Sequence, residues 1–146
     1  MNLKAPVSTL MSTSLITVSA TDKLQVAKDL FGEKSIHHLP VIDEEEKLVG
    51  ILSKTDYLYF IRPLDKDSNE PYLNEIRLKN YTIGEAMTSR VVSVTPDDSL
   101  ESALEILTEN IFHALPVVNG EELVGILTTH DILFKLLHPS KTQTAV

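Results

Sequence analysis

The chain contains the stretch Leu48-Val49-Gly50-Ile51-Leu52-Ser53-Lys54-Thr55-Asp56-Tyr57-Leu58 and repeats it as Leu123-Val124-Gly125-Ile126-Leu127-Thr128-Thr129-His130-Asp131-Ile132-Leu133. Seven of the eleven residues are identical, and both copies contain the pattern Gly-apolar-apolar-Ser/Thr-x-x-Asp. Such a pattern can place a hydroxyl and a carboxylate at the start of a helix, where anions and sugars can be held. The sequence therefore contains one small unit twice.

The duplication extends upstream of this stretch. Residues 11–42 match residues 87–118 at an offset of 76, with ten of the 32 positions identical, whereas ordinary composition would give about two by chance. The offset falls to 75 at Leu48 because the turn over residues 43–47 is one residue longer than its counterpart. A length difference confined to a turn is what a duplicated fold tolerates.

The duplication also predicts how the chain is organised. We expect repeat 1 over residues 1–62, a solvated linker over 63–80, repeat 2 over 81–138 and a polar, frayed C-terminal tail over 139–146. Repeats of about sixty residues bury little core alone, so the two should pack together as one module.

The composition of the chain limits the classes of function that it can have. Apolar residues make up 42% and charged residues 23%, as in a soluble globular protein. The chain has no cysteine, which excludes disulfides and thiolate metal sites. It has no apolar run of the ~20 residues that span a membrane and no signal-peptide core, so we expect a cytoplasmic protein without a membrane partner. The net charge of −8 argues against nucleic acid but permits a small anionic ligand at a helix start.

Each repeat is predicted to run strand, helix, strand, strand, helix, from its β-branched runs and its three-and-four apolar spacing. The expected elements are strands at 15–18 and 91–94, helices at 24–31 and 100–111, strand pairs at 39–42 with 48–52 and 115–118 with 123–127, and final helices at 56–60 and 131–137. A capping box at residues 82–85 predicts a short helix before Met87, with a counterpart over residues 6–11. A helical turn is expected at residues 74–78 of the linker.

The repeated Ser/Thr-x-x-Asp has two interpretations. Ser53-x-x-Asp56 and Thr128-x-x-Asp131 are also helix-capping patterns, in which the acid interacts with the helix dipole. Capping and ligand contact are compatible with each other. Gly50 marks a close backbone approach, a strand bulge or a ligand contact, and the same three alternatives apply to its copy in repeat 2.

The histidines do not form a metal-binding pattern. His37 and His38 are adjacent, so in a strand they would point to opposite faces, and neither His113 nor His130 has a carboxylate partner at ligand spacing. We therefore expect no metal site. His130 is either a phosphate neighbour or an exposed residue at a helix start, and the same two readings apply to Lys54.

The final helices of both repeats carry more apolar residues than one buried face needs. They include Tyr57, Tyr59 and Phe60 in the first copy and residues 132–134 and 136–137 in the second. Burial in the core is the simplest explanation for most of them. We expect the surplus to form a dimer interface.

These residues resemble a pair of cystathionine-β-synthase (CBS) domains. The resemblance is carried by His37-His38-Leu39-Pro40-Val41 with residues 50–56, and by His113-Ala114-Leu115-Pro116-Val117 with residues 125–131. It implies an α/β (α+β) fold of two β-α-β-β-α repeats, packed through their sheets with pseudo-twofold symmetry. It further implies a homodimer, and clefts between the repeats that bind an adenine nucleotide (AMP, ADP or ATP) or S-adenosylmethionine as a regulatory ligand, with no catalytic cofactor.

The resemblance also assigns roles to residues of this sequence. Ribose hydroxyls would be bound by Asp56 and Asp131. Phosphates would be bound by Ser53, Lys54, Thr128 and His130. Adenine would be bound by Ile16, Thr17, Val18, His37 and Pro40 in repeat 1 and by Val92, Ser93, Val94, His113 and Pro116 in repeat 2. The chemistry is consistent, because a carboxylate accepts from vicinal hydroxyls and free N–H groups at a helix start suit phosphate oxygens.

Two functions follow from these expectations. The first is a regulatory module that binds an adenosine-containing nucleotide and signals to a client protein through the geometry of a dimer. The alternative is a ligand-independent interaction and dimerisation module with vestigial clefts. An enzyme is not expected, because the sequence has no nucleophile–base pair, metal set or Walker-type phosphate loop.

Overall fold

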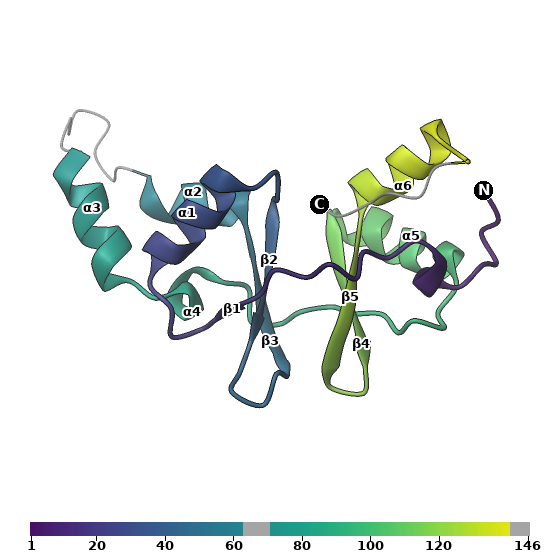
Figure 1. The fold of residues 1–146 in the computed structure, drawn as a ribbon, viewed down its shortest axis with the longest axis horizontal. Coiled ribbons are helices and arrows are strands. Elements are labelled where there is room, and N and C mark those ends of the chain that lie inside the picture. Colours follow the sequence, from purple (N-terminus) through teal and green to yellow (C-terminus); the bar gives the residue numbers. More distant parts are fainter. Residues whose placement is uncertain (63–70, 141–146) are drawn as a thin grey trace. The chain divides into compact units, whose positions relative to one another are not determined.

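The computed structural model describes residues 1–62 and 71–140 and forms two compact units (Figure 1). One unit is Ile16–Val91, called here the first-repeat unit, and the other joins Met1–Leu15 to Val92–Val146 and is called the second-repeat unit. The units cut across the repeats of the sequence. Each combines the strands and helices of one repeat with the segment that precedes the other. Much of the expected frayed tail lies outside the described residues.

The first-repeat unit contains a three-stranded sheet of order β1-β2-β3, with β1 parallel to β2 and β2 antiparallel to β3. Its elements are β1 (Val18–Ser19), α1 (Leu24–Glu33), β2 (His38–Ile42), β3 (Leu48–Ser53), α2 (Lys54–Ile61), α3 (Pro71–Asn80) and α4 (Ile83–Ala86).

The second-repeat unit repeats this plan with an antiparallel pair of strands. Its elements are η1 (Val7–Thr9), α5 (Leu100–Asn110), β4 (Ala114–Asn119), β5 (Glu122–Thr128) and α6 (Thr129–Leu137). Val94 makes a single parallel bridge to Val117, in the position that β1 occupies in the other unit.

The structure confirms the predicted helices and strand pairs, but the opening strands were predicted too long. Only Val18–Ser19 of the first is a strand, and of residues 91–94 only Val94 makes a bridge. The β-branched residues favour an extended backbone, but a strand also needs a partner, and pairing is confined to these few residues. The linker differs as well, since α3 is a ten-residue helix whose Leu78 is buried in the core.

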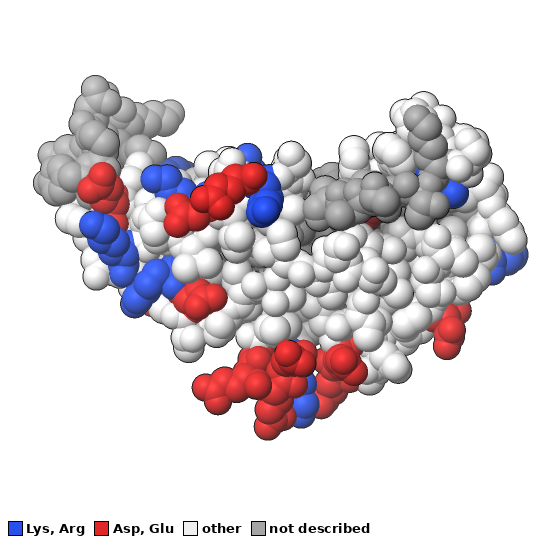
Figure 2. Space-filling view, in the orientation of Figure 1, with Lys and Arg blue, Asp and Glu red and all other residues white. Residues whose placement is uncertain are grey.

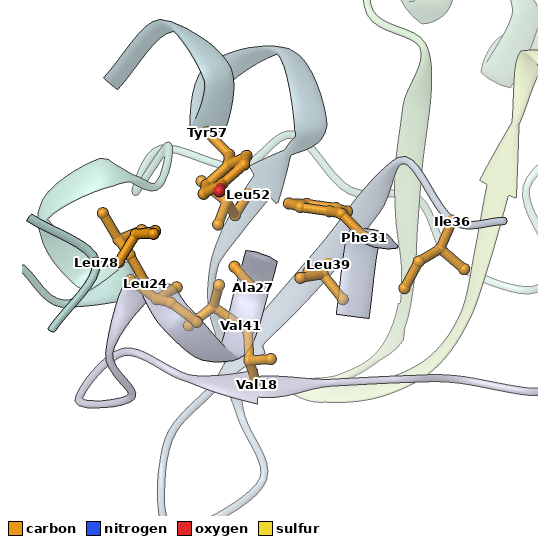
Figure 3. Close-up of a cluster of buried hydrophobic side chains, with 11 residues drawn as sticks. Val18, Leu24, Ala27, Phe31, Ile36, Leu39, Val41, Leu52, Tyr57 and Leu78 are labelled. Atoms are coloured by element: carbon orange, nitrogen blue, oxygen red, sulfur yellow. The ribbon is translucent and has the colours of Figure 1, made fainter. Parts of the chain in front are cut away.

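Each unit has its own hydrophobic core. Figure 3 shows the core of the first-repeat unit, where the rings of Phe31 and Tyr57 lie 5.6 Å apart between centroids. Burial, with a smaller effect of the Asp29 charge, raises the pKa of the Tyr57 phenol above its ordinary 10.0. The core of the second-repeat unit is built around Leu115 and Leu127, which are fully buried.

The short helices α4 and η1 complete these cores from outside the repeat. Ile83 of α4 and Val7 of η1 are both 0% exposed. The backbone N–H of Ile83 donates to the carbonyl of Asp22 at 2.8 Å, and that of Val7 donates to the carbonyl of Asp98 at 2.7 Å. The expected capping box is present, because the Glu85 carboxylate accepts from the Thr82 N–H at 2.8 Å. The same docking is therefore used in both units.

The segment after each short helix pairs with a strand next to a glycine. Thr88 exchanges two backbone hydrogen bonds with Ile51, of 3.0 and 2.9 Å, and Ser12 exchanges two with Ile126, of 2.8 and 3.0 Å. A Cβ on Gly50 would lie 2.4 Å from the sulfur of Met87. A register shift also occurs where Gly50 pairs with β2. Of the alternatives for this glycine, close approach beside a bulge is confirmed.

We predict that Ile83→Ala lowers the free energy of unfolding by about 2–4 kcal/mol, because it leaves a cavity under α4. The matched control is Ile76→Ala on α3 of the same unit, where the side chain is 48% exposed and the change should stay within about 0.5 kcal/mol. Urea denaturation of the full chain measures both. Equal effects would show that the docking of α4 does not contribute to the fold.

We predict that Gly50→Ala destabilises the chain by about 1–3 kcal/mol, because the new methyl overlaps the Met87 side chain and approaches the Thr88 carbonyl. Gly32→Ala is the control, since a Cβ there meets nothing within 4 Å in a helix. That change should stabilise the chain by about 0.5–1 kcal/mol. Thermal and urea unfolding distinguish the two signs.

Candidate functional site

The predicted site residues fall into two sets, each within one unit. The first site is defined by residues of the first-repeat unit, namely Ile16, Thr17, Val18, His37, Pro40, Ser53, Lys54 and Asp56. The second site is defined by residues of the second-repeat unit, namely Val92, Ser93, Val94, His113, Pro116, Thr128, His130 and Asp131. In each set, the strand before the final helix and the loop before the strand pair meet at one helix start.

The start of α2 holds the polar residues of the first site. Ser53 is the N-cap, and its hydroxyl oxygen accepts from the backbone N–H of Asp56 at 2.9 Å. The backbone N–H of Lys54 donates to the carbonyl of His37 at 2.8 Å. Among the described residues, the Asp56 carboxylate has no hydrogen-bond partner and is half-buried. Capping by Ser53 is therefore confirmed, and this carboxylate keeps both oxygens as acceptors.

The start of α6 has the same plan with one added interaction. The Thr128 hydroxyl accepts from the backbone N–H of Asp131 at 3.1 Å and also donates to Oδ2 of the same residue at 2.7 Å. That Oδ2 accepts the backbone N–H of Thr128 as well, at 2.7 Å. Thr129 N–H donates to the His113 carbonyl at 3.0 Å. The capping box is therefore complete, because the side chains of Thr128 and Asp131 each accept the backbone N–H of the other residue.

Asp131 is the one buried charged residue among those that the structure describes, at 4% exposure. A buried carboxylate is retained only where hydrogen bonds compensate its desolvation. Two donors from Thr128 reach Oδ2, while Oδ1 has no hydrogen bond within the described part of the chain. This oxygen is the acceptor that the second site keeps.

The strand residues of the two sets are less accessible to a ligand than the sequence predicted. The side chains of Val18 and Val94 belong to the cores, and the N–H and carbonyl of Val94 are bonded to Pro116 and Val118. Ile16, Thr17 and Ser93 are half-buried and Val92 is exposed.

Of the residues expected at the edge of the adenine slot, the two histidines are accessible and the two prolines are not. Pro40 and Pro116 are buried within β2 and β4, whereas His37 and His113 are exposed. The role of all these residues in ligand binding stays a prediction.

Sequence reasoning missed two features near these sites. Met87 and Met11 pack against the glycines of the repeated stretch, and their shared place in the repeat was the available signal. On α6, Phe134 lies between His130 and His138, with ring centroids 6.5 and 4.8 Å away. Their spacing of four residues marks one face of a helix.

The described ranges contain neither a cluster of possible metal ligands nor a helix that could span a membrane. No three His, Asp or Glu side chains there come together as a possible metal-ion site. None of the helices in those ranges combines the length and the apolar character needed to cross a bilayer.

Comparison with known proteins agrees with this geometry. The family model of the CBS domain matches residues 7–63 and 83–138. The chain is 34% identical over 130 residues to inosine-5′-monophosphate dehydrogenase of Methanocaldococcus jannaschii, covering 88% of this chain and 23% of that protein. It therefore spans about a quarter of the length of this relative.

Solved structures that share the fold include two with adenosine compounds bound. CBSX2 in complex with AMP has a TM-score of 0.75 and 32% identity, covering 93% of this chain and 99% of that one. The CBS domain pair of MJ0100, in complex with 5′-methylthioadenosine and S-adenosyl-L-methionine, has a TM-score of 0.73 and 25% identity, covering 94% and 98%. The chain belongs to the CBS domain family and contains two CBS repeats of α+β fold.

Proposed function

We propose that this chain is a regulatory module that binds an adenosine-containing ligand at the starts of α2 and α6. The observation that carries the proposal is the pair of capped helix starts, each with a carboxylate that keeps an unpartnered oxygen among the described residues. The likeness to CBS pairs in complex with AMP and with S-adenosylmethionine supports the ligand class.

In this proposal Asp56 and Asp131 accept from ribose hydroxyls. Ser53 and the backbone N–H of Thr55 bind phosphate oxygens, since a helix start carries partial positive charge. The N–H groups of Lys54 and Asp56 are already bonded to His37 and Ser53. His37 and His113 are exposed beside these helix starts and close the edge of the adenine slot. The chain itself carries out no reaction, and its effect is exerted on a client protein in the cytoplasm.

We further propose that the chain acts as a homodimer. The outer faces of the final helices expose large apolar side chains, namely Leu58 and Tyr59 on α2 and Leu133, Leu136 and Leu137 on α6. Burial of such a face in a second copy would remove it from water. Ligand would then act through its different affinity for two arrangements of the dimer.

The exposed face of α6 also favours a second candidate function, a ligand-independent interaction module. In that case the apolar face would recruit a partner and the two sites would be vestigial. Ligand binding distinguishes the two functions, because only the regulatory module responds to an adenosine compound.

We predict that AMP, ADP, ATP or S-adenosylmethionine raises the melting temperature of the chain. At a hundredfold excess over Kd, one bound ligand adds about 2.7 kcal/mol, which corresponds to about 5–10 °C for a domain of this size. Asp56→Ala or Asp131→Ala should reduce the shift, because a ribose acceptor is lost. If none of these ligands shifts the melting temperature, the result contradicts the regulatory module and favours the ligand-independent interaction module.

We predict that Leu133→Glu converts a dimer to a monomer of 16.2 kDa, because a charge cannot be buried unpaired in an apolar interface. Light scattering after size exclusion measures the mass. Ile111→Glu is the control, since Ile111 is also highly exposed in the same unit but lies at the end of α5. A dimer that survives Leu133→Glu would place the interface elsewhere.

A further inference from the structure

The two sites differ in which hydroxyl hydrogen is free. The Ser53 hydroxyl accepts from the Asp56 N–H, and its own hydrogen has no acceptor among the described residues. The Thr128 hydroxyl donates its hydrogen to Asp131 Oδ2 at 2.7 Å. A hydroxyl has only one hydrogen to donate. Ser53 can therefore donate to a phosphate oxygen, whereas Thr128 must first give up its bond to Asp131.

The two sites also differ in charge. Lys54 is the first residue of α2, and within the described residues its ammonium has no hydrogen bond or ion pair. The equivalent residue on α6 is the uncharged Thr129. Both sites hold an aspartate near that position, but Asp131 is 4% exposed whereas Asp56 is half-buried. Water therefore screens the repulsion between Asp131 and a phosphate less than that between Asp56 and a phosphate.

The surroundings of the second site add to this difference. The second-repeat unit contains three Lys or Arg against eight Asp or Glu. Of the three, Lys4 is paired with Glu101, Lys135 lies in the last turn of α6, away from its start, and Lys141 lies outside the described residues. The first turn of α6 contains no Lys or Arg, and the basic side chain that it does contain is the exposed His130. The phosphate role that the resemblance gives to His130 is therefore not part of this proposal.

We propose that the two sites divide adenosine ligands by the charge of the 5′ substituent. The first site takes a phosphorylated adenosine, and the second takes an adenosine with an uncharged or cationic 5′ group. This inference rests on the proposed adenosine binding and adds a specificity to each site. Lys54 is the residue that determines the phosphate preference, and Asp131 is the residue that opposes phosphate in the second site.

The test is isothermal titration of the full chain with AMP and with 5′-methylthioadenosine, which share base and ribose but differ in phosphate. We expect Lys54→Gln to lower the affinity for AMP about tenfold, which is the typical effect of losing one charge-assisted hydrogen bond. The affinity for 5′-methylthioadenosine should not change. Lys28→Gln is the matched control, because it removes the same charge from an exposed position on α1 of the same unit.

Two further variants assign each ligand to its site. Asp56→Asn should abolish the binding of AMP and leave the binding of 5′-methylthioadenosine intact. Asp131→Asn should abolish the binding of 5′-methylthioadenosine and leave that of AMP intact. Asparagine keeps the shape of the side chain and an acceptor for the cap, and the melting temperature of each unliganded variant verifies that it is folded. Thr129→Lys should give the second site a measurable affinity for AMP.

Specific results would overturn the inference. They are equal losses of AMP affinity in Lys54→Gln and Lys28→Gln, or loss of both ligands from a single Asp→Asn variant while the other variant binds normally. Binding of neither ligand to the unaltered chain contradicts the proposed function itself. Binding of both with no difference between the sites contradicts only the division by charge.

Discussion

Each unit depends on one interaction, the docking of the short helical segment that precedes the other repeat in the sequence. The short helices place Val7 and Ile83 in the two cores, and backbone hydrogen bonds hold the following residues against β5 and β3. Without these segments each repeat would expose an apolar face and an unpaired strand edge. Each of these segments belongs, in the sequence, to the other repeat. Neither repeat therefore contains all the residues of its own core.

The same framework positions the candidate binding residues. The paired strands place Ser53 and Thr128 at the N-cap of a helix. The carbonyls of His37 and His113 accept hydrogen bonds from the backbone N–H groups of the next residues, Lys54 and Thr129. In the proposed function, capping and ligand binding therefore use the same atoms. The Thr128 hydroxyl, which donates to Asp131, is less free to bind a phosphate than the Ser53 hydroxyl, and the proposed difference between the two sites follows from this.

Much of this was predictable from the sequence, because it rests on local patterns. Three-and-four spacing predicted α1 and α5, the Asn119-Gly120 turn is consistent with the β4–β5 hairpin, and the Ser/Thr-x-x-Asp pattern predicted both caps. The opening strands were predicted too long, because β-branched residues report backbone preference and not the presence of a partner. The burial of Leu78 was missed, because the linker has no regular apolar period.

The duplication, the fold class and the identity of the helix-start residues follow from the order of residues alone, since they depend on local propensity and on repeated spacing. Tertiary structure decided which segment completes which repeat, because that choice depends on contacts between residues far apart in the chain. It also decided which polar atoms remain free. Ser53 and Thr128 look equivalent in the sequence, and only the packed structure shows that the Thr128 hydrogen is already given to a buried carboxylate.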